Sequence, residues 1–254
     1  MRAKTAYQIS EITLECLDEW QHRKKIERLL PTIPKSEYDA YISLKKDYPK
    51  LNIHILKNHI EFICLCYKQL ESIPQQISQF THLYSANFAG NTIKKIEYLN
   101  QLIKLRDLTL GCNRISKIEE LHMLTQLESL MLGANQISKV EGLDKLTRLQ
   151  HLRLVANKIC RIEGLEKNTH LESLSIGNNQ ISKIEGLENL SNLNYLDLSY
   201  NKISKIEGLD NLRKLKEIHL YGNPINWNDE SIKKQIRKLE QMGVKFATKR
   251  PYEK

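Results

Sequence analysis

The chain has 254 residues, of which 41% are hydrophobic and 27% are charged. This composition excludes an intrinsically disordered chain, and the length allows a core that needs no disulfide or metal to stabilise it. The net charge of +9 arises from 39 basic and 30 acidic side chains that are spread along the chain instead of forming a basic block. The charge therefore permits nucleic-acid binding without indicating it.

Two features of the chain predict a cytoplasmic protein, with the nucleus as the alternative location. Residues 1–20 contain no apolar run that could form the core of a signal peptide, and no later stretch approaches the roughly 20 apolar residues of a membrane span. The number of cysteines is odd and no CxxC pair occurs, which favours reduced and mostly buried thiols. The cysteines are Cys16, Cys64, Cys66, Cys112 and Cys160.

Residues 1–59 are expected to form an N-terminal cap made of helices and a hairpin. Ser10 is a suitable N-cap for a first helix that ends near Leu30, before two prolines. Ser36 is predicted to cap a second helix, which ends before Pro49.

A hairpin is predicted at the end of this N-terminal segment. The sequences LNIHIL and HIEFICL read as strands and flank Lys57-Asn58, a suitable two-residue turn. We expect the second strand to lead into the first repeat described below, and Trp20 from the first helix to be buried against that repeat. A separate function for residues 1–59 is the alternative to this capping role.

A repeated pattern of 22 residues, LxxLxLxxNxIxxIxGLxxLxx, occupies residues 60–225. Regular copies start at Leu83, Leu105, Leu127, Leu149, Leu171, Leu193 and Leu215, and an earlier, longer copy starts at Ile60. The LxxLxL part predicts a short strand whose apolar residues point to one side, for example Leu174 and Ile176. Because a single unit cannot bury its own apolar face, we expect about eight stacked units that share one continuous core.

An asparagine and a glycine recur at fixed positions of this pattern. The asparagine is found at Asn91, Asn113, Asn135, Asn157, Asn179, Asn201 and Asn223. A buried amide there can satisfy backbone groups that are left unpaired where each strand turns, so we predict a ladder of stacked asparagines. The glycine recurs at Gly142, Gly164, Gly186 and Gly208, where we expect a turn that does not accommodate a Cβ atom.

This pattern resembles the leucine-rich repeat, in particular the 22-residue subclass best known from the leucine-rich regulatory subunit of type-one protein phosphatase. The sequence ISKIEGL, at residues 181–187 and again at 203–209, is close to that subclass. The resemblance covers residues 60–225, but the first copy departs from it because Lys68 replaces the ladder asparagine. Bacterial internalins share the period, but they carry a signal peptide, which is not expected here because residues 1–20 contain no apolar core for one.

The resemblance implies an α/β fold in the form of a leucine-rich-repeat solenoid. A parallel sheet would line the concave face, short helical or irregular segments would lie on the convex face, and helical caps would close both ends. Members of the family regulate a phosphatase or scaffold ribonucleoprotein and cytoskeletal assemblies. The resemblance therefore implies protein binding, while the identity of the partner would follow only by analogy.

Residues 226–254 are expected to form a C-terminal helical cap and a basic tail. A helix is predicted to start at Asp229-Glu230-Ser231, whose acidic side chains suit the positive end of the helix dipole. The apolar residues at helical spacing are Ile232, Ile236, Leu239 and Met242. Gly243 is predicted to end the helix, and Val244 and Phe246 to complete a lid on the last repeat.

No catalytic, cofactor-binding or metal-binding constellation is recognisable, so we expect a protein that is not an enzyme and that has no cofactor. Phosphate-binding glycine loops, nucleophile elbows and HExxH motifs do not occur in the sequence. The histidines are scattered along the chain. Cys64, Cys66 and His59 are close in sequence, but they form an incomplete ligand set, so no metal site is predicted.

The strand positions that point outward, onto the concave face, carry residues that differ between units. In the middle units these residues are mostly small, whereas large ones gather in the last units. In-register stacking would place Tyr195 beside Glu217 and Asp197 beside His219. Tyrosine, arginine and methionine are enriched at interfaces, so we predict a partner-binding surface here. Its residues are Met131, His151, Arg153, Val155, Tyr195, Asp197, Tyr200, Glu217, His219 and Tyr221.

The sequence as a whole predicts a non-catalytic protein-interaction module that binds a partner protein on its concave face. The resemblance adds a more specific hypothesis, a regulatory or scaffolding subunit of a phosphatase-like complex. The alternative is a scaffold associated with nucleic acid or ribonucleoprotein, which the net charge of +9 permits. Neither a membrane nor a small-molecule substrate is expected.

Overall fold

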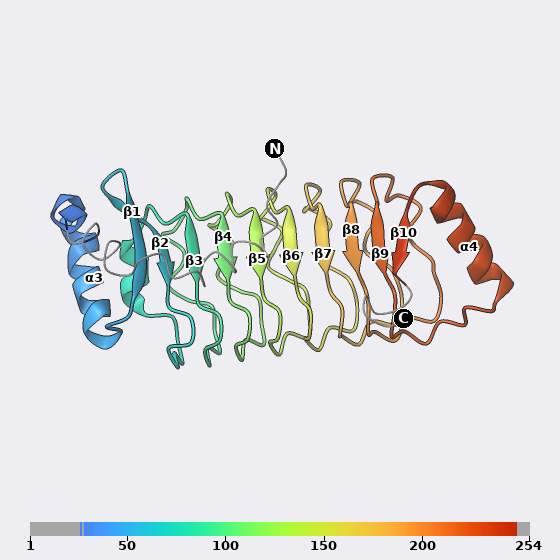
Figure 1. The fold of residues 1–254 in the computed structure, drawn as a ribbon, viewed down its shortest axis with the longest axis horizontal. Coiled ribbons are helices and arrows are strands. Elements are labelled where there is room, and N and C mark those ends of the chain that lie inside the picture. The colour runs from blue at the N-terminus through green and yellow to red at the C-terminus, as the bar shows by residue number, and fades with distance from the viewer. Residues whose placement is uncertain (1–25, 27, 248–254) are drawn as a thin grey trace.

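The computed structural model describes residue 26 and residues 28–247, which form an elongated rod (Figure 1). Ten strands lie side by side in the order of the sequence, with helix α3 at one end of the rod and helix α4 at the other. The N-terminal elements are the 3-10 helix η1 (Leu30–Thr32), α3 (Lys35–Asp47), β1 (Asn52–Leu56), β2 (His59–Cys64) and the 3-10 helix η2 (Gln75–Gln79). The elements that follow are β3 (Ser85–Asn87), β4 (Asp107–Thr109), β5 (Ser129–Met131), β6 (His151–Arg153), β7 (Ser173–Ser175), β8 (Tyr195–Asp197), β9 (Glu217–His219), α4 (Glu230–Gln241) and β10 (Lys245–Ala247).

Strand pairing confirms the predicted hairpin and the predicted in-register stacking. β1 and β2 are antiparallel, and their turn at Lys57 and Asn58 has φ values of 49° and 62°, as a tight two-residue hairpin turn requires. From β2 to β10 all neighbouring strands are parallel. Each strand residue faces its equivalent in the next repeat, as Leu130 faces Leu152. The period of the sequence therefore sets the register of the sheet.

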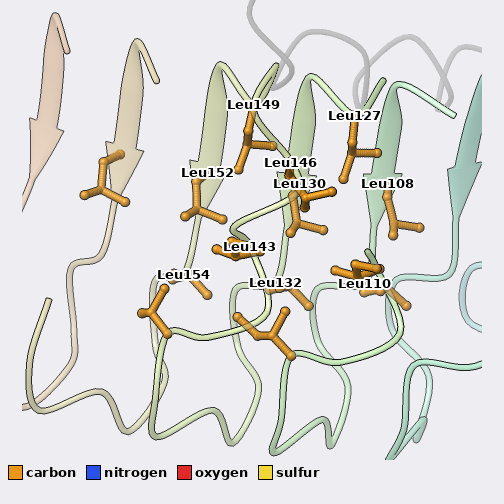
Figure 2. Packing of buried hydrophobic residues seen from close by; sticks show 14 of the residues in the cluster. Leu108, Leu110, Leu127, Leu130, Leu132, Leu143, Leu146, Leu149, Leu152 and Leu154 are labelled. Carbon is orange, nitrogen blue, oxygen red and sulfur yellow. The ribbon is translucent and has the colours of Figure 1, made fainter. Parts of the chain in front are cut away.

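The hydrophobic core runs along the rod between the sheet and the returning coils. Figure 2 shows the strand leucines Leu130 and Leu152 near Leu143 and Leu146 from the coil, and all four are at most 1% exposed. Because neighbouring repeats cover each other's leucines, the core exists only in the stack. Between the strands of the described repeats the coils are irregular apart from η2, which agrees with the expectation for the convex face.

The predicted asparagine ladder is confirmed, and Asn157 illustrates its hydrogen bonds. Its Oδ1 accepts a hydrogen bond from the backbone N–H of Ile137 at 3.0 Å. Its Nδ2 donates to the carbonyl oxygens of Leu132 and Leu154, each at 3.0 Å. Each amide therefore joins its own repeat to the preceding one. Equivalent bonds are made by Asn91, Asn113, Asn135, Asn179, Asn201 and Asn223.

The recurring glycine occupies a left-handed turn, as predicted. Gly164 has a φ of +69°, and a Cβ atom at this position would lie 2.4 Å from the carbonyl oxygen of Val140 in the preceding repeat. The close approach of successive coils, as well as the backbone conformation, therefore selects glycine here.

One repeat carries a buried asparagine where its neighbours carry leucine. Asn168 has no exposed surface and occupies the position of Leu146 and Leu190 in the adjacent repeats. Its Nδ2 donates to the carbonyl oxygens of Leu143 and Leu146 at 3.0 and 2.9 Å. Its Oδ1 has no hydrogen-bond partner among the described residues. A buried amide oxygen without a partner lowers stability, so this repeat is less stable than its sequence pattern would allow.

The second predicted N-terminal helix is confirmed as α3, but its predicted N-cap is wrong. Pro34 occupies the N-cap position instead of Ser36, and no side chain caps this helix. The helix begins two residues earlier than predicted because the carbonyl oxygen of Pro34 already accepts the first helical hydrogen bond, from the N–H of Tyr38. Tyr41 and Leu44 of α3 are buried in the core, and α3 packs against η2.

The first predicted helix is described only near its end. There the chain forms η1, in which Leu30 is buried. Its predicted N-cap Ser10 and the predicted contact of Trp20 lie outside the described residues. None of the helices in the described part of the chain has the length and apolarity needed to cross a bilayer.

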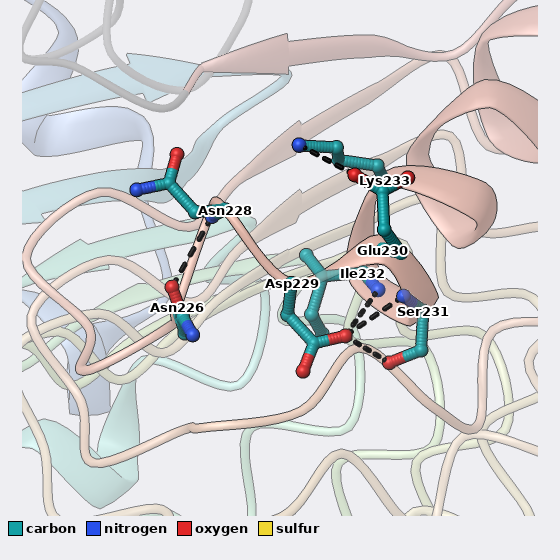
Figure 3. A network of polar contacts seen from close by, with 7 residues as sticks. All are labelled: Asn226, Asn228, Asp229, Glu230, Ser231, Ile232 and Lys233. Atoms are coloured by element: carbon teal, nitrogen blue, oxygen red, sulfur yellow. Dashed lines mark hydrogen bonds and ion pairs between the residues drawn. The ribbon is translucent and has the colours of Figure 1, made fainter.

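The predicted start of the C-terminal helix is confirmed by a network of polar contacts around Asp229 (Figure 3). The Oδ1 atom of Asp229 accepts hydrogen bonds from the backbone N–H groups of Ser231 at 2.7 Å and Ile232 at 3.4 Å. The hydroxyl of Ser231, which donates to the same oxygen at 2.6 Å, contributes most to lowering the pKa of Asp229. The ionised carboxylate thus satisfies N–H groups that the first turn of α4 leaves unpaired.

The remainder of the C-terminal cap is only partly as predicted. Ile232 and Leu239 are buried, whereas Met242 is exposed, so the apolar stripe of α4 is shorter than expected. The chain turns at Gly243, which has a φ of +82°, and then forms β10, where Phe246 packs against the core. The pairing of β10 with β9 was not predicted, because a strand of 3 residues carries no repeat signature.

The prediction of reduced and mostly buried cysteines is wrong for the described residues. Cys64 and Cys66 are joined by a disulfide. Cys64 ends β2 and Cys66 lies in the turn that follows, and the Cα atoms of this pair are 5.6 Å apart, a separation that a disulfide bridges. Cys112 and Cys160 are free and exposed, and both lie in irregular segments between the strands. Cys16 lies outside the described residues.

Replacing Asn168 with leucine is expected to raise the free energy of unfolding by about 1–3 kcal/mol, because it removes a buried oxygen without a partner. The matched control, Asn157→Leu, removes a ladder amide and leaves the N–H of Ile137 unpaired, so it is expected to cost about 2–4 kcal/mol. Urea unfolding followed by circular dichroism measures both changes. A less stable Asn168→Leu protein would contradict this account of the core.

Candidate functional site

The candidate site lies on the side of the sheet that faces away from the core, which we call the outer face. In β8 the outward residues Tyr195 and Asp197 are half-buried, and Leu196 between them is fully buried. The same alternation holds in β9, where Glu217 and His219 point outward and Ile218 is buried. The predicted division of strand residues between the core and the outer face is therefore confirmed.

The predicted neighbours on the outer face are brought together. Tyr195 is the strand partner of Glu217, and Asp197 is the strand partner of His219. The ring of His219 lies 5.2 Å from that of Tyr195, in an edge-to-face arrangement, and 5.7 Å from that of Tyr221. The ring of Tyr200 lies 5.4 Å from that of Tyr221, also edge to face. We call Tyr195, Tyr200, His219 and Tyr221 the aromatic cluster.

A chain of polar contacts orients the aromatic cluster. The Nε2 atom of His219 lies 2.6 Å from Oε1 of Glu217, and its Nδ1 atom lies 3.4 Å from the hydroxyl oxygen of Tyr195. Both contacts are satisfied when Nε2 of His219 donates to Glu217 and Nδ1 accepts from Tyr195. In β8, Asp197 accepts hydrogen bonds from the backbone N–H and the hydroxyl of Ser199 at 3.0 and 2.6 Å.

The environment of Tyr195 keeps its phenol protonated. Burial raises the pKa of Tyr195 above its ordinary value of 10.0, and the carboxylates of Asp197 and Glu217 raise it further. Arg153 opposes this shift, so it lies close enough to act on Tyr195 electrostatically. The phenol therefore stays a hydrogen-bond donor across the physiological pH range.

The position of Tyr200 depends on a glycine in the next repeat, a feature that the sequence analysis missed. Tyr200 has a left-handed backbone with a φ of 51°. A Cβ atom on Gly222 would lie 2.4 Å from the Tyr200 ring, so the ring lies directly over this glycine. The signal is present in the sequence, because Tyr67 and Gly90 form the same combination near the other end of the rod.

The other predicted site residues form a separate group on β5 and β6. Met131 faces Arg153 across these strands, and Arg153 lies over Gly133, where a Cβ atom would be 3.8 Å from its Nε. His151 on β6 and Val155 just after it are half-buried. The small outward residues of β7 separate this group from β8. The predicted residues therefore form two groups on one face, with Met131 and Arg153 further along the rod than the aromatic cluster.

The aromatic cluster lines neither of two hollows in the described surface, which favours a large partner over a small ligand. One is lined by Tyr98, Asn100 and Glu120, and the other by Asn194 and Lys216. Small-molecule sites are usually concave and apolar, whereas broad surfaces with aromatic residues are typical of protein interfaces.

Tyr195→Phe is expected to lower the free energy of unfolding by about 0.5–1.5 kcal/mol near neutral pH, because the hydrogen bond to His219 is lost. The raised pKa means that folded Tyr195 keeps a proton that the unfolded chain releases. The stability that the protonated phenol contributes is therefore present below the ordinary tyrosine pKa of 10.0, and it decreases as the pH rises through and above this value. Phenylalanine cannot ionise, so the difference in the free energy of unfolding between wild type and Tyr195→Phe should become smaller in alkaline solution.

Denaturant unfolding of both proteins at about pH 8 and about pH 10.5 measures this narrowing. Tyr84→Phe is the control, because this exposed tyrosine lies outside the aromatic cluster. If the difference in the free energy of unfolding is the same at both pH values, or is larger at the higher pH, the assigned environment of Tyr195 is wrong.

Comparisons with known proteins agree with this architecture. The family model described as Leucine Rich repeats (2 copies) matches residues 169–211 and 191–234, and the model described as Leucine rich repeat matches residues 103–159. No match was found among curated proteins.

Several solved structures are similar to this chain, each with a TM-score of 0.61. An internalin C2 from Listeria monocytogenes is 32% identical, over 67% of this chain and 75% of that chain. An internalin (InlF) from the same organism is 31% identical over 70% of this chain, and a leucine-rich-repeat protein from Leptospira interrogans is 25% identical over 70%. The chain spans about half the length of the last two, covering 51% and 52% of them. The repeat pattern, the asparagine ladder and these matches together show that the chain belongs to the leucine-rich-repeat family, whose members are in general protein-interaction modules.

Proposed function

We propose that this chain is a non-catalytic interaction module that binds a partner protein on the C-terminal part of its outer face. The observation that carries the proposal is the aromatic cluster, in which large rings gather beside the small outward residues of β7. Tyrosine contributes large contact areas with little loss of side-chain entropy, and it is enriched among the residues that dominate binding energies. Arg153 and Met131 would extend the contact toward the middle of the rod.

The rigid scaffold supports this proposal because it reduces the cost of binding. Each outward side chain is attached to a strand whose register is fixed by the asparagine ladder on the other side. Within the aromatic cluster, Tyr195 and His219 already contact each other before any partner binds. Association would then order few additional rotamers, and more of the contact energy would appear as affinity.

A narrower proposal names the catalytic subunit of a type-one protein phosphatase as the partner. The two ISKIEGL sequences, which resemble the phosphatase-regulatory subclass, support it. In this proposal the chain acts as a regulatory or scaffolding subunit in the cytoplasm or nucleus. The mixed charge of Arg153, Asp197 and Glu217 would then supply specificity around the aromatic contacts.

The alternative of a nucleic-acid-associated scaffold rests on the net charge of +9. Within the described repeats, three lysines are paired locally with glutamates. The nitrogen–oxygen distances are 3.7 Å for Lys117–Glu119, 3.7 Å for Lys139–Glu141 and 3.8 Å for Lys205–Glu207. Such pairing weakens the long-range field that would attract a phosphate backbone. We therefore favour protein binding.

We also propose that residues 1–59 and residues 226–254 act as caps on the repeats between them. The burial of Tyr41 and Leu44 in the same core as the repeats supports this role at the N-terminal end. Ile232 and Leu239 support it at the C-terminal end. Solenoids need such ends because their terminal repeats would otherwise expose core to water.

The triple variant Tyr195→Ala/His219→Ala/Tyr221→Ala is expected to lose partners that the wild-type chain captures from a native lysate. The control is Ser85→Ala/Thr109→Ala/Ser173→Ala, which changes outward residues of β3, β4 and β7. We expect wild type and control to retain a partner equally and the triple variant to bind it at least about 100-fold more weakly. Denaturant unfolding must show that the triple variant is still folded under the binding conditions.

The purified phosphatase catalytic subunit is the probe for the narrower proposal. Binding that the triple variant loses and the control keeps would support that proposal. If the triple variant retains every partner of the wild type, the outer-face proposal is wrong. A partner whose affinity falls steeply with salt and that is a nucleic acid would favour the alternative.

A further inference from the structure

Three segments that are distant in sequence bring a glutamate and two histidines together at the N-terminal end of the rod. Glu37 comes from α3, His59 begins β2, and His82 lies in the loop before β3. The Oε1 atom of Glu37 lies 2.8 Å from Nδ1 of His59 and 3.8 Å from Nδ1 of His82. We call these three residues the Glu37 cluster. The proposed binding surface at the other end of the rod does not include them.

The Glu37 carboxylate is held with one oxygen aimed at both histidines. Its side chain is only 2% exposed. Its Oε2 atom accepts a hydrogen bond from the backbone N–H of Ile60 at 2.9 Å, which leaves Oε1 for the imidazoles. A carboxylate that is oriented by a backbone hydrogen bond is a common feature of metal sites, where such contacts fix the ligand atom.

The two imidazoles are arranged side by side and are accessible to solvent. The rings of His59 and His82 are stacked, with centroids 3.4 Å apart and planes 12° apart. Their side chains are 27% and 32% exposed, so an ion can enter and waters can complete its coordination.

We propose that the Glu37 cluster binds a divalent transition-metal ion, Zn²⁺ by preference, through Oε1 of Glu37 and the Nδ1 atoms of His59 and His82. Their ligand atoms all lie within 4.8 Å of one another, so small side-chain rotations bring them to the about 2.0–2.2 Å bond lengths of zinc. Two histidines and one carboxylate form a known ligand set for zinc, with the remaining position open to water.

Binding would replace the proton on Nδ1 of His59 with the metal ion. In the metal-free protein the short contact between Nδ1 of His59 and Oε1 of Glu37 is a hydrogen bond, whose proton lies on the imidazole when the carboxylate is ionised. The metal ion takes the place of this proton at Nδ1, and Nε2 of the same ring takes up a proton from solvent in exchange, so the imidazole stays neutral. No bond to carbon changes and no electron is transferred.

The location predicts the consequence of binding. The ion would join α3, β2 and the loop before β3, which are the N-terminal cap and the start of the repeats. A ligand that binds only the folded state stabilises it in proportion to its affinity and concentration. Zinc would therefore hold the N-terminal cap against the repeats and raise the temperature at which this end of the rod unfolds.

The test is titration of chelator-treated full-length protein with ZnCl₂, followed by calorimetry and by thermal unfolding. The exposed cysteines can also bind zinc, so all proteins carry Cys112→Ser and Cys160→Ser. We expect one zinc per chain and a rise in the melting temperature. His82→Gln should weaken this binding at least about tenfold, and the control His122→Gln, which removes an exposed histidine elsewhere, should not.

A second measurement on the unsubstituted histidines keeps the test decisive if His82→Gln unfolds. In nitrogen-15 spectra, ZnCl₂ should shift the ring signals of His59 and His82 and leave those of His122 and His170 unchanged. Absence of zinc binding by the wild-type residues would overturn the proposal. So would equal affinity in the folded His82→Gln variant, or shifts confined to other histidines.

Discussion

The hydrogen bonds of the ladder asparagines are the interaction on which the rest of this structure depends. A coil this narrow leaves backbone N–H and C=O groups pointing inward, where water cannot reach them. Each ladder amide satisfies groups of two successive repeats, as Asn201 does for Ile181 and Leu198. One amide per repeat thus fixes the spacing of the strands and their register. Tyr195 and His219 are neighbours on the outer face as a consequence of bonds made on the inner one.

The same scaffold explains why outward residues can vary without disturbing the fold. They contribute little to the core, so their identity is limited mainly by the repeats beside them. Tyr200 over Gly222 and Tyr67 over Gly90 show that limit. A large ring at this left-handed position requires a glycine at the same position of the next repeat. Substitutions at this position are therefore coupled between neighbouring repeats.

The sequence period was sufficient to predict the strands, the ladder, the glycine turns and the pairing of Tyr195 with Glu217, because these repeat at a fixed interval. The unpredicted Glu37 cluster, disulfide and strand β10 depend on contacts without a period. Glu37 and His82 are distant in the chain and meet only when α3 packs on the first repeats. The disulfide between Cys64 and Cys66 and the short strand β10 likewise have no counterpart in other repeats.

Strand β10 has a consequence for how such a rod is limited in length. The last strand of a stack of repeats has unpaired backbone N–H and C=O groups along its edge, to which a further repeat or another molecule could add a strand. β10 pairs with this edge of β9, is only 3 residues long and carries the exposed Lys245. A short edge strand and an exposed lysine both discourage edge-to-edge growth into filaments. The strand that ends the sheet is thus separate from the repeats that build it. Internal repeats could be duplicated or lost during evolution while the same terminator continued to protect the growing end.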